Sequence, residues 1–185
     1  MRSMDSLSEP RLRDATLEDT DAIVALVESA YRGESGRRGW TTESDPLDGR
    51  HTDAQAEAEI LRHADSCILL AERGGQLVAS CHVQRLGEAA YFGMFAVDPG
   101  QQGNGLGKWM LAAAERAARE RWHSHAMMMT VIEQRPELLA WYARRGYRPT
   151  GEHQPFPYGD ERFGIPRRDD LRFVVLARSL AGVAA

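Results

Sequence analysis

The stretch that decides the fold is a glycine-rich turn between an apolar segment and a helix-like segment. It reads Val97-Asp98-Pro99-Gly100-Gln101-Gln102-Gly103-Asn104-Gly105-Leu106-Gly107-Lys108. Residues 91–97 before it form a β-like apolar run, and residues 109–120 after it have a helical pattern. The alternating glycines allow backbone conformations that a Cβ would forbid, and they let another molecule approach closely. Backbone N–H groups beside the positive end of a helix suit phosphate, so the turn predicts an anion-binding site.

Two common nucleotide motifs do not fit this turn. A Walker A loop requires a glycine five residues before Gly107 and a Ser or Thr after Lys108, but the chain has Gln102 and Trp109 there. The dinucleotide fingerprint requires a third glycine where the chain has Lys108. These mismatches disfavour a nucleoside triphosphatase and a dinucleotide-binding domain. A glycine-rich helix start without any ligand stays open as an alternative.

Composition narrows the class of protein further. The chain has 185 residues and a net charge of −4, so it is long enough for one domain with a sizeable core. No basic stripe favours nucleic acid, and the pairs Arg37-Arg38, Arg144-Arg145 and Arg167-Arg168 are dispersed. We interpret them as solvated surface, with contact to a pyrophosphate or an adenosine 3′-phosphate as the alternative. Without an apolar run of membrane-spanning length or a basic-then-apolar leader, we expect a soluble cytoplasmic protein that binds neither nucleic acid nor membrane.

Cysteine and histidine usage points away from metal or thiol chemistry. Cys67 and Cys81 each lie in an apolar strand-like run, which predicts buried free thiols rather than a disulfide or a nucleophile. His123 and His125 have no third ligand nearby in the sequence, so we expect no metal site.

The pattern along the chain predicts a mobile tail over residues 1–10 and a single domain over residues 11–185. Thr16 to Asp19 match a capping box ahead of a helix, and residues 32–52 form a long irregular segment. Gly93 inside a strand indicates a bulge or a close backbone approach. The expected order is a strand over 11–15, two helices, an antiparallel meander over 66–71, 76–85 and 89–97, the glycine turn, a helix, a strand over 126–132, a helix over 137–145 and two final strands.

Two motifs in this order resemble those of one family. The pattern Gln/Arg-x-x-Gly-x-Gly/Ala, filled by Gln102, Gly105 and Gly107, resembles the acetyl-CoA signature of the GCN5-related N-acetyltransferases (GNAT). The segment Leu139-Ala140-Trp141-Tyr142-Ala143-Arg144-Arg145-Gly146-Tyr147 is similar to the family's late motif. The chain departs from the pattern in two places. Gln102 stands where many members have Arg, and Arg135 stands where they often have Asn; Lys108 could supply part of the missing charge.

The resemblance implies a fold and a way of holding the cofactor. The fold is of the α+β (mixed α/β) class, with a mostly antiparallel central sheet splayed between its fourth and fifth strands and flanked by helices. Acetyl-CoA, as co-substrate, would lie in the resulting V. Main-chain groups of Phe95, Ala96 and Val97 would pair with the pantetheine amides. The pyrophosphate would be held by the turn residues Gln102, Gly103, Asn104, Gly105, Leu106, Gly107 and Lys108.

The implied reaction is direct transfer of an acetyl group from the thioester to a primary amine of a small molecule or a peptide. Tyr142 matches the family's candidate acid and a cofactor contact, because a protonated hydroxyl can donate to the departing thiolate. A backbone N–H in the 95–97 segment would stabilise the oxyanion. Glu43 is the favoured base, and Asp45, Asp48, Glu88 and Glu133 stay open. Two long loops, Gly33 to Arg50 and Gln154 to Asp170, are expected to frame the acceptor pocket, with Trp40, Phe156 and Tyr158 as its walls.

Two other functional classes stay open at this stage. One is a non-catalytic acyl-CoA sensor or an interaction domain with the same fold, because fold alone does not establish activity. The other is a protein that binds nucleotide phosphates. Nothing in the sequence identifies the acceptor, and we expect a monomer or a homodimer.

Overall fold

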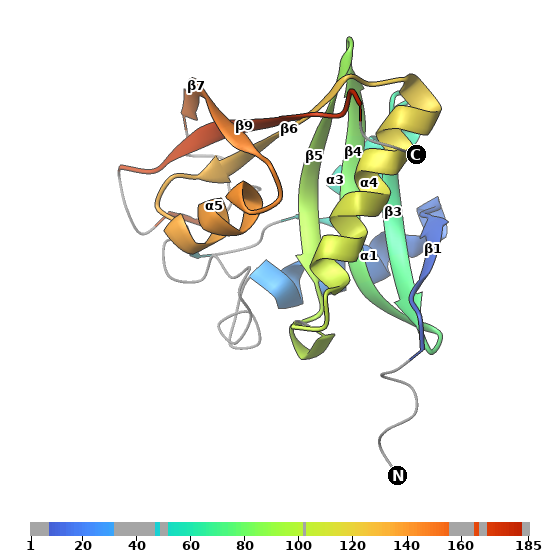
Figure 1. Cartoon of the computed structure of the whole chain (residues 1–185). Coiled ribbons are helices and arrows are strands. Elements are labelled where there is room, and N and C mark those ends of the chain that lie inside the picture. Colours follow the sequence, from blue (N-terminus) through green and yellow to red (C-terminus); the bar gives the residue numbers. More distant parts are fainter. Residues whose placement is uncertain are drawn as a thin grey trace.

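The computed structural model describes residues 8–31, 47–48, 52–101, 103–155, 165–166 and 170–182. Within them, a seven-stranded sheet has the order β1-β3-β4-β5-β6-β9-β7 (Figure 1). Its strands are β1 (Arg11–Asp14), β3 (Ser66–Arg73), β4 (Gln76–Leu86), β5 (Ala89–Val97), β6 (Ala126–Ile132), β7 (Arg148–Pro155) and β9 (Arg172–Ser179). The helices are α1 (Thr20–Tyr31), α3 (Ala54–Arg62), α4 (Leu106–Trp122) and α5 (Pro136–Ala143). The observed order of elements confirms the predicted α+β fold.

The first half of the sheet is an antiparallel meander, as the apolar runs and the turns between them predict. β3 and β4 form a hairpin whose tight turn uses Gly74 and Gly75, both with positive φ. β4 then pairs with β5 over nearly its whole length, and β1 adds to the outer edge of β3. Ahead of α1 the Asp19 carboxylate accepts a hydrogen bond from the Thr16 backbone N–H at 2.8 Å, which confirms the capping role expected of this residue.

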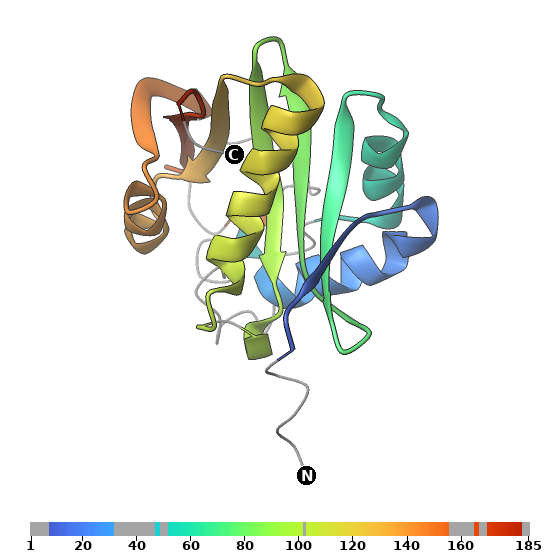
Figure 2. The ribbon, with the colours of Figure 1, turned by 45° about the vertical axis from the view of Figure 1, so that its right-hand side comes forward.

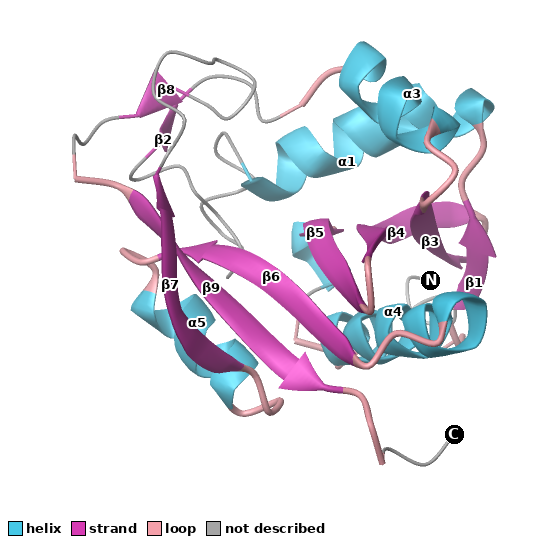
Figure 3. Cartoon of the chain, turned by 90° about the horizontal axis from the view of Figure 1, so that it is seen from above, coloured by secondary structure: helices cyan, strands magenta, loops and turns pink. Residues whose placement is uncertain are grey.

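Successive strand residues face opposite sides, and each side has its own apolar cluster. On one side α1 packs its Ile23 and Val27 against β3 and β5, and α3 lies next to α1. On the other side α4 packs Met110 and Leu111 against the opposite faces of β3, β4 and β5. Figures 2 and 3 show α4 across one face of this half-sheet and α1 with α3 across the other. The glycine turn therefore leads from the end of β5 into a helix that crosses the sheet.

The two cysteines lie in this core. Cys81 is fully buried in β4 beneath α4, and Cys67 of β3 is partly buried. Both thiols are free, which confirms the prediction. Burial raises the pKa of Cys67 to about 11, so its thiol stays protonated near neutral pH.

The second half of the sheet is β6, β9 and β7, paired antiparallel. A separate two-stranded pair, β2 (Leu47–Asp48) with β8 (Ile165–Pro166), joins the backbones of the two long loops. The sequence did not predict this pairing. It brings together the two segments that we expected to frame the acceptor pocket. Most of both segments lies outside the described residues, as do residues 1–7 of the tail predicted over residues 1–10.

Candidate functional site

The two halves of the sheet meet only at one end of β5 and β6. These strands run parallel and pair at three positions, Ala89 with Ala126, Ala90 with Met127 and Tyr91 with Met128. Beyond Tyr91 the ladder stops, although β5 continues to Val97 and β6 continues to Ile132. The predicted splay between the fourth and fifth strands of the sheet is therefore confirmed.

A β-bulge shapes the β5 side of this opening. Gly93 pairs with His82 and Ala96 with Ser80, so Met94 and Phe95 together oppose the single residue Cys81. Met94 has φ 48°, a left-handed conformation that is uncommon for a residue with a side chain. The expectation for Gly93 is confirmed, because the bulge begins directly after it. A Cβ at Gly93 would also lie 2.7 Å from Cε1 of Tyr91, so glycine leaves the space in which that ring lies.

A cavity of about 440 Å³ fills the opening. Tyr91 closes its narrow end, since its hydroxyl lies 3.2 Å from Oγ1 of Thr130 on β6. Most of the wall is apolar, which is typical of small-molecule sites. Its lining comes from β5 (Tyr91 to Phe95), β6 (Met129 to Ile132), α3 with the residue before its cap (Thr52, Ala56, Ile60), α5 (Leu138, Tyr142) and the outer strands (Gln154, Phe173).

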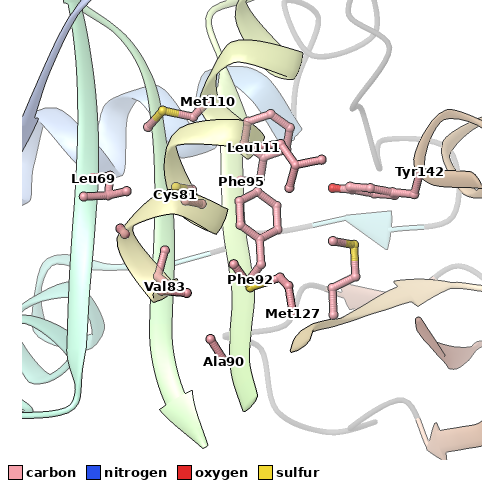
Figure 4. Close-up of a cluster of buried hydrophobic side chains, with 14 of the residues drawn as sticks. Leu69, Cys81, Val83, Ala90, Phe92, Phe95, Met110, Leu111, Met127 and Tyr142 are labelled. Atoms are coloured by element: carbon pink, nitrogen blue, oxygen red, sulfur yellow. The ribbon is translucent and has the colours of Figure 1, made fainter. Parts of the chain in front are cut away.

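Tyr142 reaches this cavity from α5. Its ring packs edge-on against Trp141 and Tyr147, with centroid separations of 5.0 and 5.9 Å. Only 5% of the residue is exposed, and the hydroxyl makes no hydrogen bond to any residue that the structure describes. Burial raises the pKa of this phenol above its ordinary value, so the group keeps its proton. Figure 4 shows the hydroxyl directed across the gap toward the Phe95 side of β5.

The glycine turn lies at the open end of β5. Gly103 and Gly105 have φ values of 89° and 75°, which only glycine adopts without strain. Gly105 is the N-cap of α4 and offers no side-chain acceptor to the first turn of the helix. Gly107, by contrast, lies inside that first turn. The turn therefore presents exposed backbone at the positive end of a 17-residue helix, as an anion site requires.

Basic side chains lie next to the start of α4. A second hollow of about 420 Å³ is lined by residues of α4, by the turn after α5 and by Arg178 of β9. Arg178 pairs with the buried Glu115 at 2.9 Å, and Arg145 stacks on Trp141 at 3.6 Å. Lys108 and Arg144 both line this hollow and are exposed. Lys108 thus places one solvent-facing cation at the turn, and Arg144 adds a second in the hollow that extends from Lys108 along α4.

The predicted site residues fall into three groups. Phe95 and Tyr142 line the cavity, whereas Ala96 and Val97 are buried in β5 next to it. Gly103, Asn104 and Lys108 are exposed and Leu106 is buried at the start of α4. Five others lie outside the described residues, namely Trp40, Glu43, Gln102, Phe156 and Tyr158.

Of the further carboxylates considered as a base, two have described side chains. Glu133 is engaged by Arg172 through contacts of 2.6 and 2.8 Å, and this partner lowers its pKa. Glu88 is exposed in the turn between β4 and β5 and does not line the cavity. Neither position brings an available carboxylate into the cavity.

Sequence reasoning missed the contribution of α3. Thr52, Ala56 and Ile60 line the cavity, and Glu57 lies fully buried behind them. A signal was present, because Glu57 falls three residues before Ile60 and four before Leu61, on the apolar face of the helix. A carboxylate at such a position needs a specific reason.

Comparisons with known proteins agree with this geometry. The sequence matches the Acetyltransferase (GNAT) family over residues 20–147. No curated protein matches it. Solved structures share the fold at low identity. The ribosomal-protein-S18-alanine N-acetyltransferase of Escherichia coli has a TM-score of 0.68 and 15% identity, covering 95% of this chain and 97% of its own. An N-acetyltransferase of Staphylococcus aureus Mu50 has a TM-score of 0.70 and 11% identity, covering 94% and 99%.

A third structure, yncA of Salmonella typhimurium with its cofactor acetyl-CoA, has a TM-score of 0.66 and 19% identity, covering 96% of this chain and 98% of its own. Among the described residues of our chain, no helix is long and apolar enough to cross a membrane. The same residues contain no cluster of His, Cys, Asp or Glu that could hold a metal ion. The family match covers more than two thirds of the sequence, and the splayed sheet, the glycine turn and the α5 tyrosine agree with it: the chain belongs to the GNAT acetyltransferase family.

Proposed function

We propose that the protein is an N-acetyltransferase that moves an acetyl group from acetyl-CoA directly to a primary amine of a small molecule or a peptide. The observation that carries this proposal is the opening between β5 and β6, with Tyr142 on one side of its cavity and a bulged β5 on the other. A strand whose ladder ends early can pair with an extended amide-bearing chain instead.

The coenzyme would lie along β5 toward the glycine turn. Its pantetheine amides would pair with main-chain groups of the segment from Phe95 to Val97. The backbone of residues 102–108 would hold the pyrophosphate at the start of α4. Lys108 at the turn and Arg144 in the adjoining hollow support this placement, because exposed cations favour a phosphate-rich ligand.

Acetyl-CoA would supply the activated acyl group, and the chain's own residues would guide its transfer. The Met94–Phe95 bulge changes the direction of main-chain groups beside the cavity, so an N–H of the 95–97 segment can receive the charge that grows on the carbonyl oxygen. Tyr142 keeps its proton and can give it to the departing thiolate sulfur. The apolar wall around both groups limits water, which favours the amine as nucleophile.

The test is a screen of primary amines and N-terminal peptides with acetyl-CoA, in which the release of free CoA thiol is followed. An acetyltransferase releases thiol in proportion to amine and yields an N-acetylated product of matching mass. If the protein binds acetyl-CoA and acetylates none of the acceptors, the proposal is wrong and a non-catalytic acyl-CoA sensor explains the fold. If ATP or NAD stabilises the protein against heat more than CoA does, a nucleotide-phosphate binder is favoured instead.

A further inference from the structure

A buried carboxylate stands behind the cavity on the α3 side. Glu57 has no exposed surface, although it lies in the first turn of a helix at the protein surface. The Thr52 hydroxyl donates a hydrogen bond to Oε1 of Glu57 at 2.9 Å. The other oxygen, Oε2, is buried and has no hydrogen-bond partner among the described residues. Burial of a carboxylate with half of its acceptors unused is costly, so this position needs an explanation.

Thr52 connects this carboxylate to the cavity. It lines the cavity together with Ala56 and Ile60, whereas Glu57 does not. The backbone N–H of Thr52 donates to Oε1 of Glu28 on α1 at 3.1 Å, so acidic side chains hold Thr52 through both its hydroxyl and its backbone. The opposite wall of the cavity includes Gly93 and Met94, at the bulge of β5.

The charged and titratable groups around Glu57 favour a cation at the Thr52 end of the cavity. Burial raises the pKa of Glu57, the nearby Asp53 raises it further, and the Thr52 hydrogen bond opposes both. From α1 the facing group is Glu28. His82 of β4 pairs with Ile68, a member of the cluster under α1, and burial lowers the pKa of its ring to about 4, so the ring is neutral near pH 7. His63 caps the far end of α3. An ammonium group at Thr52 would thus enter an acidic and partly desolvated environment.

Building on the proposed acetyl transfer, we propose that the Thr52 end of the cavity receives a cationic primary amine and that Thr52 relays its proton to Glu57. The ammonium N–H bond breaks as its proton passes to Oγ1 of Thr52, and the original hydroxyl proton passes to the Glu57 carboxylate. The products are a neutral amine and a neutral carboxylic acid, so charge and protons balance. Glu57 acts through Thr52 and is therefore a positioning residue that also holds the proton, while Thr52 touches the substrate.

The same geometry selects among amines. A free α-amino acid would bring its own carboxylate toward Glu28 and Glu57, and like charges repel in a site of low polarity. Acceptors without an acidic group next to the amine are therefore favoured over free amino acids.

The test uses Glu57→Gln and Thr52→Val, with Thr52→Ser as the matched control. Glutamine has the shape of a protonated glutamate and keeps an acceptor for the Thr52 hydroxyl, but it cannot take a proton. Valine keeps the volume of threonine and removes the hydroxyl, whereas serine keeps the hydroxyl. The probes are acetyl-CoA with a series of primary alkylamines, and methoxyamine, whose nitrogen is already unprotonated at neutral pH.

We expect Glu57→Gln and Thr52→Val to lower kcat/KM for alkylamines by about 100-fold, the usual contribution of a positioned base. Their rates with methoxyamine should fall far less, and the ascending part of the alkylamine pH profile should shift to higher pH. Thr52→Ser keeps the hydroxyl and should therefore recover most of the rate that Thr52→Val loses, and acetyl-CoA affinity should not change in any variant.

Wild-type kinetics in Glu57→Gln over the whole pH range would overturn the relay. An equal loss with alkylamines and methoxyamine would also overturn it, because a merely structural role affects both nucleophiles alike. If Glu57→Gln does not fold, Thr52→Val decides by the same comparison. If the wild-type protein binds acetyl-CoA but acetylates no amine, the proposed function itself fails, which is a different result.

Discussion

Tyr142 and Tyr147 lie five residues apart, and the structure predicts opposite outcomes when each is changed to phenylalanine. The Tyr142 side chain is almost fully buried, but its hydroxyl faces the cavity, makes no hydrogen bond to a described residue and is not among the fully buried unpaired polar atoms. A fully buried unpaired hydroxyl would carry a desolvation cost of roughly 1–3 kcal/mol, and because water in the cavity can reach this hydroxyl, its removal relieves only a small part of that cost. The free energy of unfolding of Tyr142→Phe should therefore stay unchanged or rise by up to about 1 kcal/mol.

Activity should change in the other direction. Loss of a general acid costs about 10²–10⁴-fold in rate, so kcat of Tyr142→Phe should fall by at least about 100-fold. The ring contacts with Trp141 and Tyr147 do not depend on the oxygen, so the shape of the cavity is kept. Acetyl-CoA affinity should change little.

Tyr147→Phe is the matched control. Its hydroxyl donates to Oε1 of Glu115 at 2.8 Å, and Glu115 is also paired with Arg178. A buried hydrogen bond to a charged group contributes about 1.5–3 kcal/mol, so this variant should lose roughly that much stability. Tyr147 does not line the cavity, so its kcat should stay near the wild-type value.

Urea unfolding measures the stability of both variants, and thiol release measures kcat. A large loss of stability in Tyr142→Phe would show that its hydroxyl has a structural partner and would refute the reasoning. An unchanged kcat in that variant would remove the assigned acid role. If Tyr147→Phe lost kcat but kept its stability, the two hydroxyls would not have the separate catalytic and structural roles assigned to them.

Three further predictions concern single positions. Gly105→Ala forces a Cβ onto a residue with φ 75°, which costs about 1–2 kcal/mol, and it should weaken acetyl-CoA binding measured by calorimetry; unchanged affinity would contradict the assigned turn. Gly93→Ala places a Cβ 2.7 Å from the Tyr91 ring, so thermal unfolding should show a loss of about 1–3 kcal/mol, and wild-type stability would contradict the close contact. Arg13 lowers the pKa of Asp19 from 3.8 to about 2, so this carboxylate stabilises the fold above about pH 4 and the gain disappears as pH falls toward 2. Asp19→Asn has no such charge to lose, so its melting temperature should fall less than that of the wild type between pH 4 and pH 2. Equal falls in the two proteins would refute the assignment.

The fold could be predicted in good part because local patterns and tertiary structure agree. The β3–β4–β5 meander follows from apolar runs of strand length and from the turns between them, which contain Gly74-Gly75 and Gly87. The splay between β5 and β6 could not be derived from periodicity, since both strands are mostly apolar along their whole length. It came from the resemblance carried by Gln102, Gly105 and Gly107. The bulge was indicated only by Gly93, and its left-handed residue turned out to be Met94.

Residues of the site could be predicted where a sequence motif includes them, but not where tertiary packing brings distant segments together. Tyr142 was found through its sequence neighbours and does line the cavity. Thr52 and Glu57 could not be placed beside it from the sequence, because α3 and β5 are brought together by packing through α1 and not by any local spacing. A carboxylate on an apolar helix face was the one available sign.

The central claim is that the coenzyme arm pairs with β5 in the opening beside β6 while the glycine turn holds the pyrophosphate. Residue-resolved amide hydrogen exchange, with and without saturating acetyl-CoA, tests it most directly. The claim predicts slower exchange at residues 92–97 and 103–108, with no change in the β3–β4 hairpin. Binding of acetyl-CoA that leaves both segments unprotected, or no binding at all, would contradict it.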